Sequence, residues 1–264
     1  MPLVERLVYR AVSRVMASRP SQWHVLPHGP IEPLAAGLWR VTGFTPPGAL
    51  VPREMVLYRL AGSGLLVHSA VALDAAGIAQ LESLGRPEVL VVPNRMHRID
   101  AGLYKRRYPD VRVVCPAAAR SIVEEVVAVD GTAEEVLPSY GIRCHAPRGI
   151  RPLELTYELP LSAGRVLLFT DILFNLDAAY LRAHVPALKR WTLRAIGSAG
   201  FFGITRLGRW MVLEDRAAFG NWLVELADSL PDLRVICVAH GSPVLVQCAE
   251  ALRSAARRLQ RSRR

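Results

Sequence analysis

Lysine, cysteine motifs and long apolar runs are scarce in this 264-residue sequence. Only Lys105 and Lys189 are lysines, so the formal net charge of +10 rests almost wholly on arginine. No apolar run approaches the ~20 residues that a membrane-spanning helix needs, so we expect no transmembrane segment. Arginines are spread along Met1–Arg19 and do not precede an unbroken apolar run, which speaks against a secretory signal. The sequence therefore predicts a cytoplasmic protein.

The cysteines show no metal-binding or redox spacing. There are four of them, at Cys115, Cys144, Cys237 and Cys248, and none forms a CxxC pair or a zinc-ribbon pattern. Without a secretory signal they are expected to be reduced and mostly buried thiols. Hydrophobic residues make up 51% of the chain and charged residues 21%, which is typical of a globular protein and excludes wholesale disorder.

Arginine is concentrated at both ends of this basic protein, and a basic surface attracts anionic partners. The last dozen residues carry six arginines and no acid, at Arg253, Arg257, Arg258, Arg261, Arg263 and Arg264. We favour a solvated C-terminal helix here, and contact with a phosphate-rich or membrane-surface partner is the alternative. The amphipathic pattern of Leu3–Ala17 predicts a helix that packs on the domain, with a membrane surface or a partner again as the alternative.

Hydrophobic periodicity divides the chain into residues 1–34, an amphipathic helix with a connecting segment, and residues 35–264, one large domain. Strands are expected at Gly37–Gly43, Met55–Leu60, Gly64–Val71, Glu88–Val92, Val111–Cys115, Ile142–His145, Leu153–Leu159, Arg165–Phe169 and Leu233–Val238. Helices are expected at Asp74–Leu84 (stopped by Gly85), Ala101–Arg107, Ala117–Val129, Glu214–Leu230 and Val244–Leu259, and Ala179–Leu207 is expected to be mainly helical. Because the strands come in clusters as well as alternating with helices, the order favours an α/β fold with mixed, largely antiparallel sheets and helices on the outer faces.

Three of the expected buried strands end in polar residues. One leads into the loop Pro93–Asp100 with His97, a second leads to Asp171, and a third leads to His240. In sheets flanked by helices, binding and catalytic sites often lie where the strands end and the loops begin. A carboxylate and two imidazoles form either a three-ligand metal site with open positions or an acid–base pair with an orienting carboxylate.

Each of these residues also has an ordinary structural interpretation. His240, at a strand end before a glycine, would simply satisfy backbone groups. Asp171 would be the N-cap of a helix beginning at Ile172, a common role for aspartate. His97 would be an exposed loop residue between charged neighbours. The functional interpretation rests on the three residues occurring together at strand ends.

Aromatic residues alternate with arginines in one later stretch, at Trp191, Phe201, Phe202 and Trp210. We favour ordinary core packing for these side chains. A lid over the site or a lipid-facing cover is the alternative. Aromatics among arginines also stack nucleic-acid bases, but no nucleic-acid motif accompanies them here.

The order and wording of the polar strand ends resemble the metallo-β-lactamase fold. The run Leu65–Pro116 resembles its first half, in which a strand and helix lead to a further strand, a metal loop and another helix. "VLLFTDILFN" (Val166–Asn175) resembles the strand that ends in the metal-bridging aspartate, and "VICVAHGSPV" (Val235–Val244) the strand that ends in the last histidine ligand. The resemblance covers Ala35–Leu259, is closest to an uncharacterised branch of the fold, and implies an αββα sandwich.

The metal loop departs from the pattern of that fold. Working members carry His-x-His-x-Asp-His, and an alignment on Gly102 places Asn94, Met96, Arg98 and Ile99 at those positions. None of the four is a good zinc ligand, and Arg98 brings positive charge to where a cation should bind. His145 is only a loose candidate for the middle histidine. The resemblance thus implies a degenerate metal site, and a dinuclear zinc centre is not expected.

Our leading hypothesis is a weak or mononuclear metal-dependent hydrolase of ester or phosphoester substrates. Its ligands would be His97, Asp171 and His240 around one Zn or Fe/Mn ion, with Asp171 and His240 as the catalytic residues. Metal-free chemistry by Asp171 and His240 is one alternative. A relic pocket that binds an anionic ligand through Arg95 and Arg98 is another.

A competing class is a non-catalytic binding or scaffold module that has lost its metals. Such a module would use its basic surface for an acidic protein, a lipid surface or a nucleic acid. Near the loop, His68 is interpreted as a core or capping histidine. Asp100 is interpreted as the ion-pair partner of Arg95 or Arg98.

Overall fold

The computed structural model describes residues 22–45 and 51–261, and the chain divides into two compact units. Unit 1 runs to Tyr140 without Leu50–Pro52, and unit 2 consists of Leu50–Pro52 and Gly141–Arg264. No helix in the described ranges is both long and apolar enough to cross a membrane. The helix expected at Leu3–Ala17, the centre of the Pro-Pro-Gly turn and the last two arginines lie outside the described residues.

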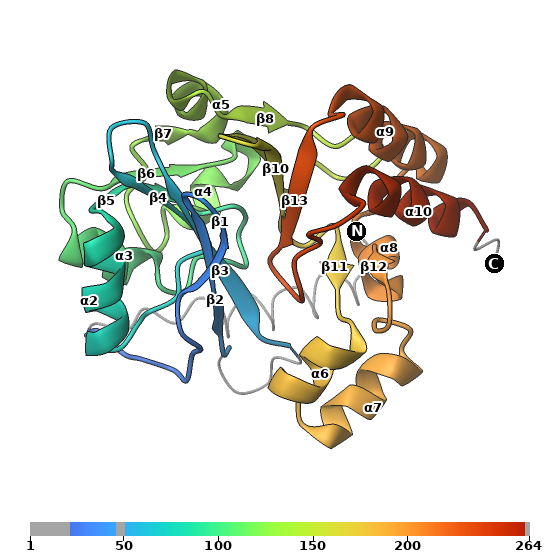
Figure 1. Ribbon diagram of the computed structural model, residues 1–264, viewed down its shortest axis with the longest axis horizontal. Coiled ribbons are helices and arrows are strands. Elements are labelled where there is room, and N and C mark those ends of the chain that lie inside the picture. Colours follow the sequence, from blue (N-terminus) through green and yellow to red (C-terminus); the bar gives the residue numbers. More distant parts are fainter. Residues whose placement is uncertain (1–21, 46–50, 262–264) are drawn as a thin grey trace. The chain divides into compact units, whose positions relative to one another are not determined.

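Unit 1 is built on a seven-stranded sheet in which every strand pairs with its neighbour in sequence (Figure 1). Its strands are β1 (Glu32–Ala35), β2 (Leu38–Gly43), β3 (Arg53–Arg59), β4 (Leu65–His68), β5 (Pro87–Val91), β6 (Arg112–Cys115) and β7 (Gly131–Thr132). The pairs from β1 to β4 are antiparallel and those from β4 to β7 are parallel. The expected mixture of antiparallel and parallel strands is confirmed.

The parallel pairs need crossovers, and helices supply them. The helices of unit 1 are α2 (Ala75–Leu84), α3 (Ala101–Arg107), α4 (Arg120–Val123) and α5 (Ala133–Val136), with 3₁₀ turns at Ala117–Ala119 and Leu137–Tyr140. Helix α2 begins where the Asp74 carboxylate accepts a hydrogen bond from the Gly77 amide at 2.7 Å. It ends at Gly85, whose φ of 155° suits glycine, as the sequence predicted.

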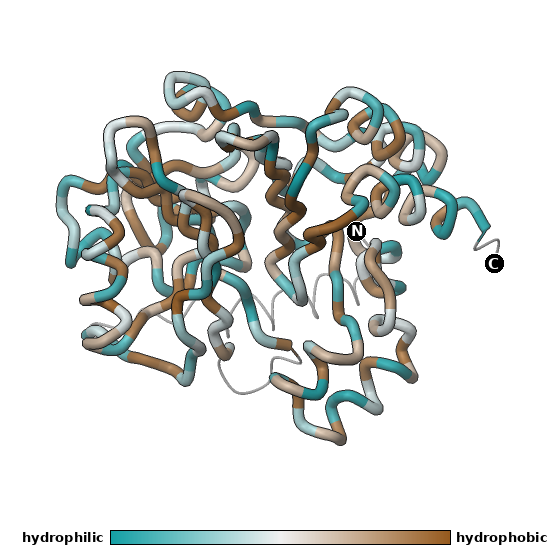
Figure 2. The backbone as a smooth tube through the Cα atoms, in the orientation of Figure 1, coloured by the Kyte–Doolittle hydropathy of each residue, from teal (hydrophilic) through white to brown (hydrophobic). Residues whose placement is uncertain are grey.

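The core of unit 1 lies between one face of its sheet and helices α2 and α3. Leu57, Val67 and Leu90 of the strands pack in one cluster with Leu81 of α2 and Tyr104 of α3. Hydrophobic residues are concentrated in the strands (Figure 2). Burying each such side chain contributes roughly 1.5–3 kcal/mol.

The helix predicted over Ala117–Val129 is wrong in its second half. The structure has a 3₁₀ turn and the short helix α4, after which the chain turns away from helical geometry. Val127 and Val129 join the core of unit 1 there. Valine has a low helix propensity because its side chain is β-branched. Burial of these two valines in the core therefore outweighs the weak local preference for a helix.

Unit 2 holds a four-stranded sheet in the order β13-β10-β9-β8 and a two-stranded ribbon. Its strands are β8 (Arg143–His145), β9 (Thr156–Leu161), β10 (Gly164–Phe169) and β13 (Leu233–Val238), and the ribbon pairs β11 (Phe174–Asn175) with β12 (Phe202–Gly203). Strands β10 and β13 are parallel, and Phe169 is level with Val238. Both strands therefore end at the same edge of the sheet.

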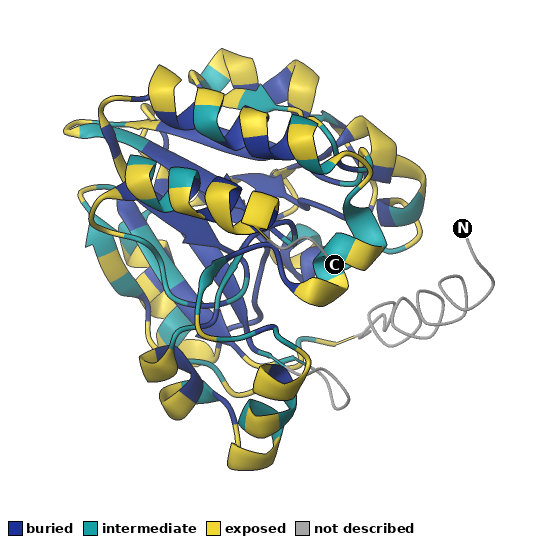
Figure 3. Cartoon of the chain, turned by 90° about the vertical axis from the view of Figure 1, so that its right-hand side faces the viewer, coloured by how far each residue is buried: buried dark blue, intermediate teal, exposed yellow. Residues whose placement is uncertain are grey.

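Helices follow the strands of unit 2. They are α6 (Ala178–His184), α7 (Ala187–Ala195), α8 (Arg206–Val212), α9 (Arg216–Ser229) and α10 (Cys248–Arg261). Leu167 and Ile236 of the sheet pack with Phe219 of α9 and Leu252 of α10 in one core cluster. The outward surfaces of the helices are exposed (Figure 3).

Core packing of the aromatic–arginine stretch is contradicted at its two tryptophans. The side chain of Trp191 on α7 is 69% exposed and that of Trp210 on α8 is 48% exposed. Helix α8 has no buried residue at all. The positive φ angles of Gly197 and Gly200 end the helical stretch between α7 and α8, so the expected helix over Ala179–Leu207 is interrupted there.

Candidate active site

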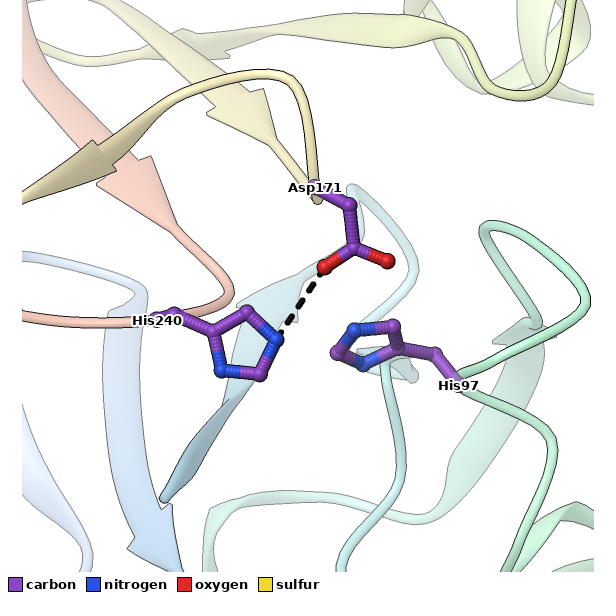
Figure 4. Close-up of side chains that lie close together, drawn as sticks. All are labelled: His97, Asp171 and His240. Atoms are coloured by element: carbon purple, nitrogen blue, oxygen red, sulfur yellow. Dashed lines mark ion pairs between the residues drawn. The ribbon is translucent and has the colours of Figure 1, made fainter. Parts of the chain in front are cut away.

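Asp171 and His240 lie side by side in unit 2. Asp171 follows β10 by two residues and His240 follows β13 by two residues, at the edge where these parallel strands end. His240 Nε2 is 3.1 Å from Asp171 Oδ1 (Figure 4). The side chains are 12% and 26% exposed, so the pair is sheltered and still accessible to solvent.

Two contacts hold the His240 ring. Its Nδ1 lies 2.7 Å from the carbonyl oxygen of Pro52, and its face stacks on Phe174 with a centroid distance of 5.0 Å. A carbonyl oxygen only accepts hydrogen bonds, so Nδ1 carries the proton of the ring. The other ring nitrogen, Nε2, faces Asp171. If Nε2 carries a second proton, the two residues form an imidazolium–carboxylate pair, and if it does not, its lone pair is available to a cation.

A buried carboxylate fixes the turn that carries Asp171. Glu154, which is 4% exposed, accepts hydrogen bonds from the backbone amides of Thr170, Asp171 and Ile172 at 2.8–3.2 Å. The residues after Asp171 do not form a helix, so its interpretation as a helix N-cap is wrong. Sequence reasoning missed Glu154, although a lone acid between Leu153 and Leu155 was the signal for it.

His97 belongs to unit 1, where it is buried. Its Nδ1 lies 2.7 Å from Ser69 Oγ, and its backbone amide donates to the side-chain oxygen of Asn94 at 3.1 Å. The same oxygen accepts from the Met96 amide at 2.8 Å, which forms a local turn around Asn94. His97 is thus not the exposed loop residue of the ordinary interpretation, because the loop folds it inward.

Arg98 is buried in unit 1 and already has an acidic partner. Its Nη1 donates to Glu125 at 2.7 Å and to the carbonyl of Ile122. Burial lowers the pKa of Arg95, and the nearby charge of Arg98 lowers it further. Anion binding by Arg95 and Arg98 stays a prediction, and an anion at Arg98 would compete with Glu125.

Asp100 is the buried partner of an arginine that sequence reasoning did not consider. Its carboxylate forms an ion pair with Arg53 of β3 and accepts from the Ala72 amide at 2.8 Å. The expected partners, Arg95 and Arg98, are therefore wrong. Arg53 lies 47 residues before Asp100, so the pairing depends on the register of the sheet and not on local spacing.

The remaining histidine candidates have structural surroundings. His145 Nε2 lies 2.8 Å from the buried carboxylate of Glu158, which also pairs with Arg165. His68 is buried on β4, in line with the interpretation as a core histidine. Of the predicted site residues, the structure of unit 2 brings together Asp171 and His240, and His97 is placed by its own loop in unit 1.

The residue types of the three predicted ligands suit a single divalent metal ion. Two imidazole nitrogens and one carboxylate oxygen are the ligands of many catalytic zinc and non-haem iron sites. Both histidines have Nδ1 engaged by an oxygen, which is the usual way that a ligating histidine is oriented. The side chains of Asn94, Met96 and Ile99 offer no comparable ligand for a second ion.

Comparison with known proteins shows the fold. The sequence matches no protein-family model, and no similar sequence is found among curated proteins. Solved structures do match: the metallo-β-lactamase DIM-1 has a TM-score of 0.57 at 12% identity, over 89% of this chain and 99% of that one. FIM-1 from Pseudomonas aeruginosa, in its mono-zinc form, has a TM-score of 0.56 at 12% identity, over 91% and 98%. A metallo-β-lactamase from Erythrobacter litoralis has a TM-score of 0.57 at 15% identity, over 86% and 96%.

The chain therefore has a metallo-β-lactamase-like α/β fold, and the fold class expected from the sequence is confirmed. At 12–15% identity, the likeness to these structures concerns the fold and not the activity.

Proposed function

We propose that this protein is a hydrolase of ester or phosphoester substrates that uses one metal ion held by His97, Asp171 and His240. The observation that carries the proposal is the Asp171–His240 pair, in which Nε2 of a ring already protonated at Nδ1 faces a carboxylate oxygen at 3.1 Å. Two such groups bind a divalent cation in place of the shared proton. FIM-1, a structure with the same fold, was solved in a mono-zinc form.

Residues of unit 2 would supply two of the three metal ligands and the groups that position them. Asp171 and His240 would bind the ion and, on the alternative without metal, would exchange the proton that lies between them. Phe174 and the Pro52 carbonyl would keep the His240 ring in place, and Glu154 would keep the Asp171 turn in place. When bound, the ion would supply Lewis-acid polarisation of the ester and a lowered pKa of water.

The role of His97 is the part of the proposal that links unit 1 to unit 2. Its burial and its Nδ1 contact with Ser69 are what a third ligand needs, because they fix which nitrogen is presented. The loop has no second ligand among Asn94, Met96, Arg98 and Ile99, so we propose one ion and not two. We also propose that this loop is a degenerate form of the metal loop of the fold, as in the uncharacterised branch that the sequence resembles.

The number of metal ions bound per chain tests the proposal. Protein purified without chelator or histidine tag is expected to contain close to one zinc, iron or manganese ion per chain by elemental analysis. Asp171→Ala, His240→Ala and His97→Ala are each expected to lower that content at least about tenfold, which is the scale for removing one of three ligands. His24→Ala, at an exposed histidine of unit 1, is the matched control and should change nothing.

The same variants separate the alternatives. Hydrolysis of p-nitrophenyl acetate and bis(p-nitrophenyl) phosphate should fall with metal content. Activity that persists in the metal-free protein and disappears in His240→Ala would favour metal-free chemistry by the pair. A wild-type chain with less than about 0.1 metal per chain and no activity would overturn the hydrolase and leave the binding or scaffold class. Unchanged metal in His97→Ala would confine the site to unit 2.

A further inference from the structure

One segment of unit 2 is basic throughout. Between Asp177 and Glu214 the sequence contains no aspartate or glutamate. The cations in this interval are Arg182, Lys189, Arg190, Arg194, Arg206 and Arg209. The segment forms helices α6, α7 and α8 and the links between them. Its positive charge is therefore not offset by any acid of its own.

The same segment displays apolar side chains to solvent. Five of the eight large hydrophobic residues that are exposed in the described chain lie within it, namely Leu188, Trp191, Ile196, Leu207 and Trp210. Exposed residues run along the helices at the bottom of the view in Figure 3. A monomeric protein rarely exposes so many large apolar residues in one short stretch unless they have a partner.

Helix α7 carries an outward apolar face. Leu188 is 77% exposed, and Leu188, Trp191 and Ala195 follow the three-to-four spacing that puts them on one side. Leu193 points the opposite way and is the buried residue of the helix, in the small core that it shares with Tyr180. The helix is thus anchored by one face and presents its second apolar face outward.

Helix α8 repeats the pattern and adds crowded charge. Leu207 and Trp210 are exposed three residues apart, and the Arg206 side chain packs against Gly197 at the end of the α7 segment. Burial lowers the pKa of Arg209, and the charges of Arg216, Arg206 and Arg258 lower it further. These cations repel one another, so an anion bound among them would relieve the repulsion.

We propose that helices α7 and α8 dock this protein onto an anionic lipid surface. Trp and Leu side chains would enter the boundary between headgroups and acyl chains, where the amphipathic tryptophan ring is favoured. The flanking arginines and Lys189 would contact lipid phosphates, each basic residue strengthening binding about fivefold. The acid-free composition selects an anionic surface over a neutral one and over an acid-bearing copy of this chain. The function is separate from the hydrolase.

Co-sedimentation with lipid vesicles tests the proposal. The full chain is expected to bind vesicles of phosphatidylcholine with about one third phosphatidylglycerol, to bind pure phosphatidylcholine vesicles weakly, and to be released by salt. Leu188→Ser with Trp191→Ser should weaken binding at least about tenfold, because both insertable side chains of α7 are lost. Arg194→Glu should weaken it by about tenfold through charge alone.

Two control variants show whether any loss of vesicle binding is specific to helices α7 and α8. Leu245→Ser with Val246→Ser removes another exposed apolar pair elsewhere in unit 2, and Arg86→Glu reverses an exposed charge of unit 1. Both should bind vesicles like the wild type, and circular dichroism should show all variants folded. Absence of binding to the anionic vesicles, or equal losses in test and control variants, would overturn the proposal. So would binding to a DNA duplex that exceeds binding to the vesicles and disappears in the same test variants.

Discussion

The two units use their polar residues in different ways. In the loop Pro93–Asp100 of unit 1, the charged side chains of Arg98 and Asp100 are buried and paired with Glu125 and Arg53. In unit 2, Asp171 and His240 are partly exposed, and protein groups hold the Asp171 turn and the imidazole ring in place. Arg98 and Asp100 of the first loop therefore stabilise unit 1 through buried ion pairs, whereas Asp171 and His240 of unit 2 remain partly exposed to solvent.

The loop of unit 1 follows β5, and its Arg98 forms an ion pair with Glu125 of the same unit. In unit 2 the strand ends lead to Asp171 and His240, and the contacts of Glu154 and Pro52 hold the Asp171 turn and the His240 ring in place. Substitutions in the two regions should consequently affect different measurements.

The largest effect is expected from Asp100→Ala. Removing this carboxylate leaves the buried guanidinium of Arg53 without its acidic partner and the Ala72 amide without its acceptor. Breaking one side of a buried ion pair typically costs about 3–5 kcal/mol of unfolding free energy. Urea denaturation should show this loss. Asp110→Ala, which breaks the exposed ion pair with Arg86, should cost about 0–1 kcal/mol by the same measurement.

Glu154→Gln should follow, with effects on both stability and the site. The charged acceptor of three consecutive backbone amides becomes a neutral amide with one acceptor oxygen. Hydrogen bonds to a charged group contribute about 1.5–3 kcal/mol, so we expect a loss of about 2 kcal/mol in urea denaturation. Zinc affinity should fall roughly tenfold as the Asp171 turn loosens.

Its control is Glu250→Gln, at an exposed carboxylate that pairs with Arg257 on α10. That variant should match the wild type in both measurements. If Glu154→Gln lowers stability but leaves zinc affinity unchanged, Glu154 is a structural residue only and does not position Asp171 for a metal.

Ser69→Ala tests whether unit 1 contributes to the site at all. The substitution removes the oxygen that contacts Nδ1 of His97. Loss of such an orienting contact commonly weakens metal binding by about 10–100-fold, and we expect the lower end because His97 also keeps its Asn94 contact. Competition titration with a zinc chelator measures the change. An unchanged affinity would show that the Ser69 contact does not orient a metal ligand and is structural only.

The sequence predicted the parts of the fold that depend on local pattern. Hydrophobic runs and turn residues located the buried strands, and Asp74 and Gly85 marked the ends of α2. The positions of Asp171 and His240 followed from the strand ends, because parallel neighbours end at one edge. The contacts of Glu154 and the pairing of Arg53 with Asp100 could not be predicted, since both join residues brought together only by tertiary folding.

The exposure of the tryptophans was expected only on the alternative interpretation, for a related reason. Aromatic residues usually pack in a core, and the pattern around Trp191 and Trp210 does not by itself tell an inward face from an outward one. Only the packing of Leu193 in the small core of unit 2 decides which side of α7 is buried. The resulting surface is a property of the fold, although the residues that form it were visible in the sequence.

The smallest effect expected concerns two cysteines, one in each unit. Burial raises the pKa of Cys115 on β6 to about 12, whereas Cys144 on β8 is partly exposed. A raised pKa keeps the thiol neutral at pH 8, so iodoacetamide should modify Cys144 and leave Cys115 intact in the folded protein. Since an unfolded chain would ionise this thiol first, its contribution to stability is present at pH 8 and is lost as the pH rises from about 9 toward 12. Mass spectrometry of the modified peptides gives the result, and rapid labelling of Cys115 at pH 8 would show that the core of unit 1 opens to solvent during the labelling.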